Sequence, residues 1–239
     1  VSDMDELATT LVMFAQPHEA ASGGLVCLHD SGGERQLIID LADGLKVPLT
    51  EVEESTTARL SEMLDPGLPA VNPLDAWGAG GPNASATMAS CFSILLTDSG
   101  AAMGAVVHDR GPNSEIYSSY LDYLEKAQRA SGKPVFLVAN RQGSGADELA
   151  ISSTYQGLPV IDGVTQFLVG ARCLLAYRDF QQRAVMKCDV TDQQKVDYWK
   201  RQLQDCDYVS ESLASELLRD FGIPMIQSLE VSSLDELQT

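Results

Sequence analysis

The residues with the clearest chemical potential lie in a short turn, Asp30-Ser31-Gly32-Gly33, between an apolar run and a helical pattern. Glycine has no Cβ, so Gly32 and Gly33 let the backbone turn sharply and approach a ligand closely. The helix that follows begins with unpaired N–H groups at the positive end of its dipole, a combination that binds anions. Ser31 adds a hydroxyl group. The turn therefore predicts a phosphate-sized anion site, although strand–helix connections also use Gly and Ser for purely structural turns.

A second polar loop, Asn72-Pro73-Leu74-Asp75, follows another short apolar run. Proline stiffens the entry to this loop, and Asn72 and Asp75 supply polar side chains. Asp75 is suited either to capping a turn or to orienting a neighbouring loop. We expect Asp30, Asn72 and Asp75 to support the site at residues 31–34.

Two histidines, His29 and His108, lie at the ends of predicted strands, and Arg110 follows the second one. An imidazole in such a place is a candidate general acid–base or phosphate contact, and it is also suited to packing or hydrogen bonding in the core. The three residues are therefore candidates for polar contacts. No spacing typical of a metal site occurs, and no catalytic residue is assigned.

Composition limits the partners that we expect. Acidic residues number 34 and basic residues 16, the net charge is −18, and 44% of the residues are hydrophobic. Such an acidic surface repels nucleic acid and anionic membranes, and no apolar run is long enough to span a bilayer. Five widely spaced cysteines without a CxxC motif favour reduced thiols, and Cys27 and Cys91 are predicted to be buried. We therefore expect a cytoplasmic protein with no nucleic-acid or membrane partner.

The elements that must position these loops form an alternation of apolar runs and helical patterns. Strands are expected at 25–28, 47–49, 70–71, 103–107, 135–139 and 158–161, and helices at 34–43, 55–64, 84–98, 114–130, 146–155 and 163–180. This alternation predicts an α/β fold, a flavodoxin-like doubly wound parallel sheet with helices on both faces. Ligands of such sheets bind beyond the carboxyl ends of the strands, which is where the polar loops lie.

The same patterns predict the domain organisation. Residues 1–23 form a helical lead-in and linker, 24–182 the flavodoxin-like domain, 183–209 a linker that carries at most a short helix, and 210–239 a short α/β extension. Ser210 is expected to cap the helix that opens the extension. Thirty residues cannot bury a core alone, and the chain does not begin with Met, so we expect a fragment of a longer protein.

The order of several segments resembles a known family. Four segments look like the ligase-CoA domain of the NDP-forming acyl-CoA synthetases, which are relatives of succinyl-CoA synthetase. They are LVCLHDSGGERQLIIDL at 25–41, Asn72-Pro73-Leu74-Asp75, Ser131-Gly132-Lys133-Pro134-Val135 and Gly157-Leu158-Pro159-Val160. Residues 210–224 look like the start of the family's ATP-grasp domain, and residues 1–14 look like the segment that leads out of its CoA-ligase domain. The resemblance covers nearly the whole chain.

The resemblance implies an ADP-forming ligase that makes acyl-CoA from a carboxylic acid, CoA and ATP through a phosphohistidine. It also implies that the helix opening at Ser31-Gly32-Gly33-Glu34 holds the phosphohistidine loop. The full-length enzyme would use ATP, CoA and Mg. This domain would assemble with the CoA-binding, CoA-ligase and ATP-grasp domains of the same protein, in a homo-oligomer. The fragment alone is expected to be inactive and to bind none of these cofactors tightly.

Two features depart from the family pattern. The phosphorylated histidine of the family lies in a Gly-rich motif of the preceding domain, and neither His29 nor His108 matches it, so no catalytic histidine is assigned to this chain. Glu34 places an acid where phosphate approaches. The sequence leaves three alternatives open for Glu34. Its carboxylate forms a hydrogen bond with the turn, it forms a hydrogen bond with a protonated histidine, or its charge weakens anion binding at the site.

Other functions stay open as well. A non-catalytic flavodoxin-like binding or interaction module accounts for the same elements. A phosphoacceptor receiver needs a lysine beyond its fifth strand, but Lys133 precedes the strand at 135–139 and lies at the opposite edge of the sheet. A flavin or dinucleotide module needs a longer phosphate loop or a GxGxxG motif, and neither occurs.

Overall fold

The computed structural model describes residues 1–109, 118–142, 147–183, 192–204, 206–226 and 231. The chain divides into two compact units, Val1–Arg183 and Ala184–Thr239. The elements of the first unit are α1 (Met4–Phe14), β1 (Gly24–His29), α2 (Gly32–Leu45), α3 (Glu54–Ser61), β2 (Leu74–Asp75), α4 (Ala84–Thr97), β3 (Ala101–His108), α5 (Ser118–Ser131), β4 (Val135–Ala139), α6 (Glu148–Tyr155), β5 (Val160–Asp162) and α7 (Val164–Gln181).

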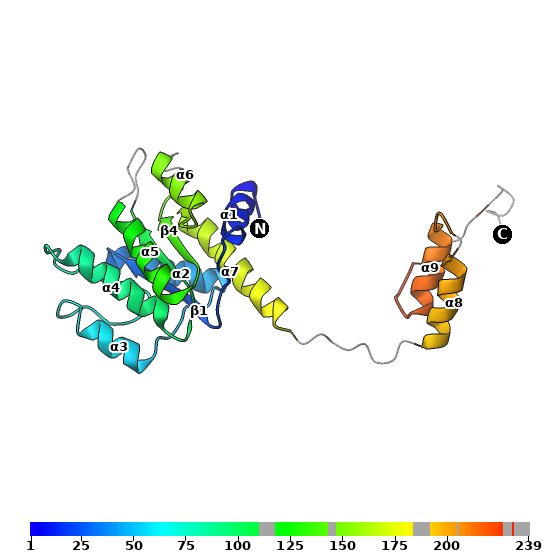
Figure 1. The fold of residues 1–239 in the computed structure, drawn as a ribbon, viewed down its shortest axis with the longest axis horizontal. Coiled ribbons are helices and arrows are strands. Elements are labelled where there is room, and N and C mark those ends of the chain that lie inside the picture. The colour runs from blue at the N-terminus through cyan, green and yellow to red at the C-terminus, as the bar shows by residue number, and fades with distance from the viewer. Residues whose placement is uncertain (110–117, 143–146, 184–191, 205, 227–230, 232–239) are drawn as a thin grey trace. The chain divides into compact units, whose positions relative to one another are not determined.

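The five strands form one parallel sheet in the order β2-β1-β3-β4-β5. Helices α4 and α5 pack on one face of the sheet, and α2 and α7 pack on the other (Figure 1). The order reverses direction at β1, which lies between β2 and β3. The predicted flavodoxin-like doubly wound fold is confirmed, and its ligand edge is the edge where β1, β3 and β4 end.

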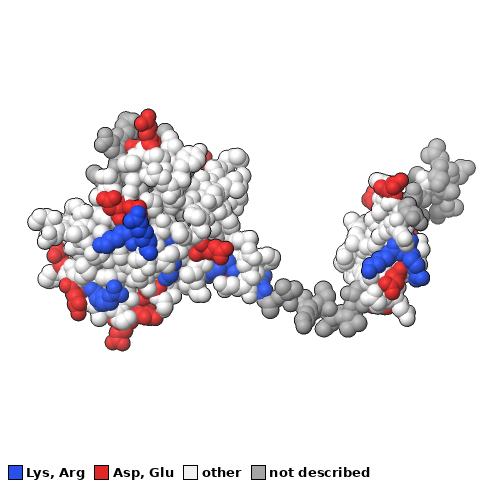
Figure 2. Space-filling view, in the orientation of Figure 1, with Lys and Arg blue, Asp and Glu red and all other residues white. Residues whose placement is uncertain are grey.

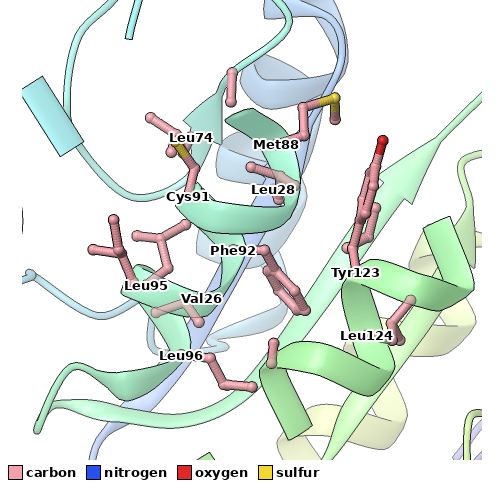
Figure 3. Close-up of a cluster of buried hydrophobic side chains, with 14 of the residues drawn as sticks. Val26, Leu28, Leu74, Met88, Cys91, Phe92, Leu95, Leu96, Tyr123 and Leu124 are labelled. Atoms are coloured by element: carbon pink, nitrogen blue, oxygen red, sulfur yellow. The ribbon is translucent and has the colours of Figure 1, made fainter. Parts of the chain in front are cut away.

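The central strand β1 shows why this sequence forms a buried parallel strand. All six of its residues are buried, as expected for a strand that is covered on both faces. Val26 and Leu28 pack under α4 and α5, as Figure 3 shows. Leu25 and Cys27 belong to the cluster on the opposite face. The predicted burial of Cys27 and Cys91 is confirmed.

The lead-in helix α1 packs along α7. Asp3 caps α1 by accepting a hydrogen bond of 2.8 Å from the backbone N–H of Glu6. Contact with α7 is close because Gly170 has no side chain, and a Cβ there would lie 2.3 Å from the Met13 sulfur. The N-terminal helix is therefore part of the first compact unit.

Two of the expected strands are wrong. Residues 47–49 form no strand and contribute an isolated bridge between Leu25 and Leu49. Pro48 lacks an N–H group, and the segment is held by its carbonyl oxygen, which accepts from the Leu25 N–H, and by a bond from the Thr50 N–H. Residues 70–71 are not a strand either, because the edge strand β2 begins later, at Leu74.

Two helices have other bounds than expected. The helix expected at 34–43 is α2 (Gly32–Leu45), and Lys46 after it takes the left-handed cap conformation with φ of 58°. The helix expected at 55–64 is α3 (Glu54–Ser61), and its N-cap residue is Glu53. The ends shift by one to three residues and leave the ligand edge unchanged.

The second unit contains α8 (Gln193–Leu203) and α9 (Glu211–Asp220). Trp199 is buried, and its indole N–H donates a 2.8 Å hydrogen bond to the Asp220 carboxylate. The side chain of Ser210 accepts from the Leu213 N–H, so the predicted helix cap is confirmed. The helix α8 lies within the range expected as a linker, and most residues after 226 lie outside the described residues.

Candidate functional site at the N-terminus of α2

The N-terminus of α2 opens at the ligand edge of the sheet with free backbone donors. Gly32 and Gly33 are exposed, and Ser31 is the N-cap residue but makes no side-chain cap hydrogen bond. The backbone N–H groups of Gly32, Gly33 and Glu34 meet no acceptor among the described residues. Helices usually satisfy these groups with a capping side chain. The arrangement leaves three donors and the positive helix end available to a ligand.

Glu34 joins this helix end to β4. Its Oε1 atom accepts a 2.6 Å hydrogen bond from the side-chain amide of Asn140, which follows β4 directly. Burial raises the pKa of Glu34 to about 8, and the nearby carboxylates of Asp30 and Asp109 act in the same direction. Because neutral Glu34 adds no negative charge, the acid that the sequence places next to the glycines is compatible with an anion at neutral pH.

Asp30 is fixed from the opposite face of the sheet. Its Oδ2 atom accepts a 2.5 Å hydrogen bond from the hydroxyl group of Tyr120 on α5. The Tyr120 ring also contacts His108 edge-on, with 5.4 Å between the ring centroids. The turn before α2 is therefore held by a residue that is 90 positions away in the sequence.

Asn72 and Asp75 have different structural roles. The Asn72 side chain accepts from the Cys27 N–H at 2.8 Å and donates to the carbonyl oxygens of Leu25 and Thr50 at 2.9 and 3.0 Å. These hydrogen bonds tie Asn72 to β1 and to Thr50, which follows the segment at 47–49. Asp75 accepts from the backbone N–H of Trp77 at 3.3 Å, as the turn-capping alternative predicts. Its other oxygen borders Gly32.

The two histidines at the strand ends are buried. Burial, and to a smaller extent the charge of Arg35, lowers the pKa of His29 to about 3, so this ring is neutral. Neither of its nitrogens has a hydrogen-bond partner among the described residues. His108 is 1% exposed. Both rings belong to the interior beneath the site, and Arg110 lies outside the described residues.

A hollow of about 620 Å³ lies beside Gly32, between the turn at 30–32 and the loop that follows β2. Asp30, Asp65, Asp75 and Trp77 are among the residues that line it. The Asp65 carboxylate accepts a 2.9 Å hydrogen bond from the backbone N–H of Ala79.

Several residues at this edge were not foreseen as site residues. They are Asp65, Trp77, Asp109, Tyr120 and Asn140. Asp109 and Asn140 immediately follow strands, and that position is a signal the sequence does contain. Trp77 lies in the loop that follows β2 and has the same signal. Asp65 and Tyr120 lie in a connection and on a helix, where the sequence has no comparable signal.

The described residues contain no group of His, Cys, Asp or Glu side chains that could hold a metal ion. Within the same part of the chain, every helix is too short or too polar to cross a membrane. On the face shown in Figure 2, basic side chains lie in small groups among acidic ones.

Comparison with known proteins gives structural matches only. No protein-family model and no curated protein matches the sequence. The crystal structure of the PH0766 protein of Pyrococcus horikoshii OT3 matches with a TM-score of 0.62 and 18% identity, over 77% of this chain. The apo form of dinucleotide-forming acetyl-coenzyme A synthetase 1 of Candidatus Korarchaeum cryptofilum matches with a TM-score of 0.61 and 14% identity, also over 77% of this chain.

The likeness shows the fold. The same Korarchaeum protein in complex with phosphate and ADP matches equally well, with a TM-score of 0.61. This chain spans only 42% of the Pyrococcus protein and 40–41% of the Korarchaeum protein. It therefore resembles one part of a larger synthetase, and the activity of the whole protein is not carried over by the match.

Proposed function

We propose that this chain is part of an ADP-forming acid–CoA ligase and that the N-terminus of α2 receives the phosphohistidine loop of another domain. The observation that carries the proposal is the exposed helix start at Gly32 and Gly33, where three backbone donors have no acceptor among the described residues. A phosphoryl group is an anion of the size and charge that such a helix start binds. The structural match to part of an acetyl-coenzyme A synthetase supports the same function.

In this proposal the chain binds and orients, and the covalent chemistry takes place on residues elsewhere in the full-length protein. His29 is fully buried and neutral, and burial of His108 likewise keeps its ring from solvent. Neither is placed to receive a phosphoryl group from a bound nucleotide. ATP, CoA and Mg belong to the full-length ligase in this proposal, together with its CoA-binding, CoA-ligase and ATP-grasp domains.

The test is anion binding by the whole chain, measured by NMR on ¹⁵N-labelled protein. Sulfate is the probe because its charge stays constant between pH 6 and 9. We expect saturable shifts of the amide signals of Gly32, Gly33 and Glu34. The N-terminus of α4 is an internal control, because its N-cap residue Asn83 also makes no side-chain cap hydrogen bond. Equal shifts at both helices, or none at α2, would refute the proposed anion site.

A second measurement tests whether this chain binds and orients the phosphohistidine loop without itself catalysing the formation of acyl-CoA. The chain is incubated with ATP, Mg, CoA and a panel of short carboxylic acids, and acyl-CoA is measured by chromatography. We expect no acyl-CoA. Its formation at an enzymatic rate would show that this chain holds the catalytic residues, which contradicts the proposed role.

A non-catalytic interaction module is the alternative function. Exposed apolar side chains on α6 favour it, in particular Ile151 and Tyr155, which line a groove of about 640 Å³ together with Val12 and Ala15. Domain assembly uses surfaces of this kind, so the alternative is compatible with a binding role within a larger ligase.

A further inference from the structure

The helix α1 presents its large apolar side chains to solvent. Its buried residues are Glu6, Thr10 and Met13, and two of these three are polar. Thr10 and Met13 lie against Gly170 of α7. Four large apolar side chains are 73%, 37%, 61% and 39% exposed, in the order Met4, Leu7, Leu11 and Phe14. A surface helix normally has the opposite arrangement, so this apolar face is suited to a contact that the described residues do not make.

The four exposed side chains form a regular seam, which we call the α1 seam. They follow one another at intervals of three, four and three residues, which is the a/d spacing of paired helices in a coiled coil. Ala8 and Ala15 each follow a seam residue directly, and their small side chains let the backbone of another helix approach closely. The seam is therefore shaped for a helical partner.

An apolar groove adjoins the C-terminal end of the seam. It has a volume of about 640 Å³ and is lined by Val12 and Ala15 of α1 and by Ile151 and Tyr155 of α6, among others. The Ile151 and Tyr155 side chains are 50% and 90% exposed. None of the described residues that line the groove is Lys or Arg. One end of α1 thus carries the protruding Met4, and the other end borders an apolar hollow.

A protrusion and a hollow at opposite ends of one helix are what a two-fold contact between identical helices requires. In such a contact, a residue i of one copy meets a residue j of the other, and the pair occurs twice. If two α1 helices run antiparallel, Met4 lies beside Phe14 of the partner subunit, at the edge of the partner's groove. Leu7 then lies beside Leu11 of the partner subunit. A second copy of the chain therefore covers the seam along its whole length.

The charges of α1 favour the antiparallel direction. The charged residues among 1–16 are Asp3, Asp5 and Glu6, and all three lie at the N-terminal end of the helix. Parallel helices would bring these acidic ends together, whereas antiparallel helices keep them apart and also oppose the two helix dipoles. The seam residues and the flanking alanines are uncharged, so burying them costs no charge desolvation.

We propose that two copies of this chain form a dimer in which their α1 helices pack antiparallel through the α1 seam. This inference does not depend on the proposed function, and it assigns a surface to the homo-oligomer that the family resemblance implies. Because α1 has only 11 residues, the contact is short, and we expect a dissociation constant of about 1–100 μM.

The test is analytical ultracentrifugation of the whole chain over a concentration range of about 1–300 μM. We expect the average mass to rise from that of one chain toward that of two. Leu11→Lys should weaken the dimer roughly tenfold or more, because it buries a charge at the centre of the seam. Leu37→Lys is the matched control, since Leu37 is an exposed leucine on α2, 44% exposed, and should leave the dimer unchanged.

Mixing two variants tests the direction of the helices. Leu7→Glu and Leu11→Lys should each be monomeric alone, and thermal unfolding followed by circular dichroism checks that both are folded. In an antiparallel pair of one copy of each, the new carboxylate lies beside the new ammonium group, and the other Leu7–Leu11 contact stays intact. We therefore expect the mixture to form a heterodimer. Parallel helices would leave both charges beside leucines, and the mixture would stay monomeric.

Three outcomes would overturn the inference. A chain that stays monomeric over the whole range would mean that something other than a second copy covers the seam. A dimer that Leu11→Lys does not weaken would use another surface, and variants that stay monomeric when mixed would exclude the antiparallel pairing. None of these results bears on sulfate binding at Gly32 and Gly33, so the dimer and the proposed function stand or fall separately.

Discussion

The side-chain amide of Asn140 donates a 2.6 Å hydrogen bond to Glu34, and this contact ties the end of β4 to the first turn of α2. The two residues are 106 positions apart. The contact holds a carboxyl group near the carboxylates of Asp30 and Asp109, where burial and like charges raise its pKa and favour its protonated form. The charge at the helix start is therefore set by the protonation of one residue.

The stability of the first unit should depend on pH through Glu34. Its pKa is raised from 4.5 to about 8 in the folded protein, so the folded state retains a proton that the unfolded state has lost. The free energy of unfolding therefore falls as pH rises through this window. In Glu34→Gln this contribution is absent, and we expect the variant to be about 1–2 kcal/mol more stable than the wild type at pH 9, since solvent screens a half-exposed carboxyl.

Urea unfolding at pH 4 and pH 9 measures the difference. At pH 4, below both the unfolded value of 4.5 and the folded value of about 8, Glu34 is mostly protonated in both states. The two proteins should agree there within about 0.5 kcal/mol, because glutamine is also neutral and retains an oxygen for the Asn140 amide. A difference between the two proteins that does not change with pH contradicts the raised pKa.

Anion binding at α2 should weaken as pH rises. Ionised Glu34 adds a negative charge next to the donors of Gly32 and Gly33, and sulfate keeps its own charge over this range. We expect the dissociation constant of sulfate to rise severalfold between pH 6.5 and pH 9 in the wild type and to stay constant in Glu34→Gln. NMR titration at the Gly33 amide measures both, and a parallel rise in the two proteins would exclude Glu34 as the cause.

The two glycines of the turn should respond differently to substitution by alanine. A Cβ on Gly32 would lie 3.3 Å from the Asp75 carboxylate, which is tight, whereas a Cβ on Gly33 would meet only the Ser31 hydroxyl at an ordinary 3.7 Å. Gly33→Ala should therefore keep or raise stability by about 0.5 kcal/mol, because alanine loses less chain entropy on folding. Gly32→Ala should be the less stable of the two variants in thermal unfolding.

Gly33→Ala also tests why a glycine is needed at that position. The fold accepts a methyl group there, so a requirement for glycine must come from the approach of a ligand. We expect sulfate affinity to fall severalfold in this variant while the melting temperature is maintained. Unchanged affinity would mean that the ligand does not approach the backbone at Gly33.

Asn72 should matter for stability and not directly for ligand binding. Alanine at this position leaves the Cys27 N–H and the carbonyl oxygens of Leu25 and Thr50 without their partner. We expect Asn72→Ala to lower the free energy of unfolding by about 2–4 kcal/mol, measured by urea denaturation. Asn83→Ala is the control, because the Asn83 side chain makes no cap hydrogen bond with α4, and it should change stability by less than about 0.5 kcal/mol. Similar losses in both variants would contradict the assigned role.

The sequence by itself determined the sheet and its ligand edge. Residues 24–29, 101–108 and 135–139 are apolar runs between helical patterns, and a run that is buried on both faces has few alternatives to a parallel strand. The helix after the turn was also predicted, at 34–43, and the structure extends it to Gly32–Leu45. The edge strand was not, because two residues pair in β2 and a proline interrupts the run at 47–49.

Only the tertiary structure decided what surrounds that helix start. Tyr120 reaches Asp30, and Asn140 reaches Glu34, across 90 and 106 positions of sequence. Local patterns carry no information about such pairs, because the fold brings them together only when separate strands end at the same edge. The hollow beside Trp77 likewise arises from packing and not from any motif. The sequence predicted where a candidate site lies, and the contacts between distant residues set the charge of its side chains.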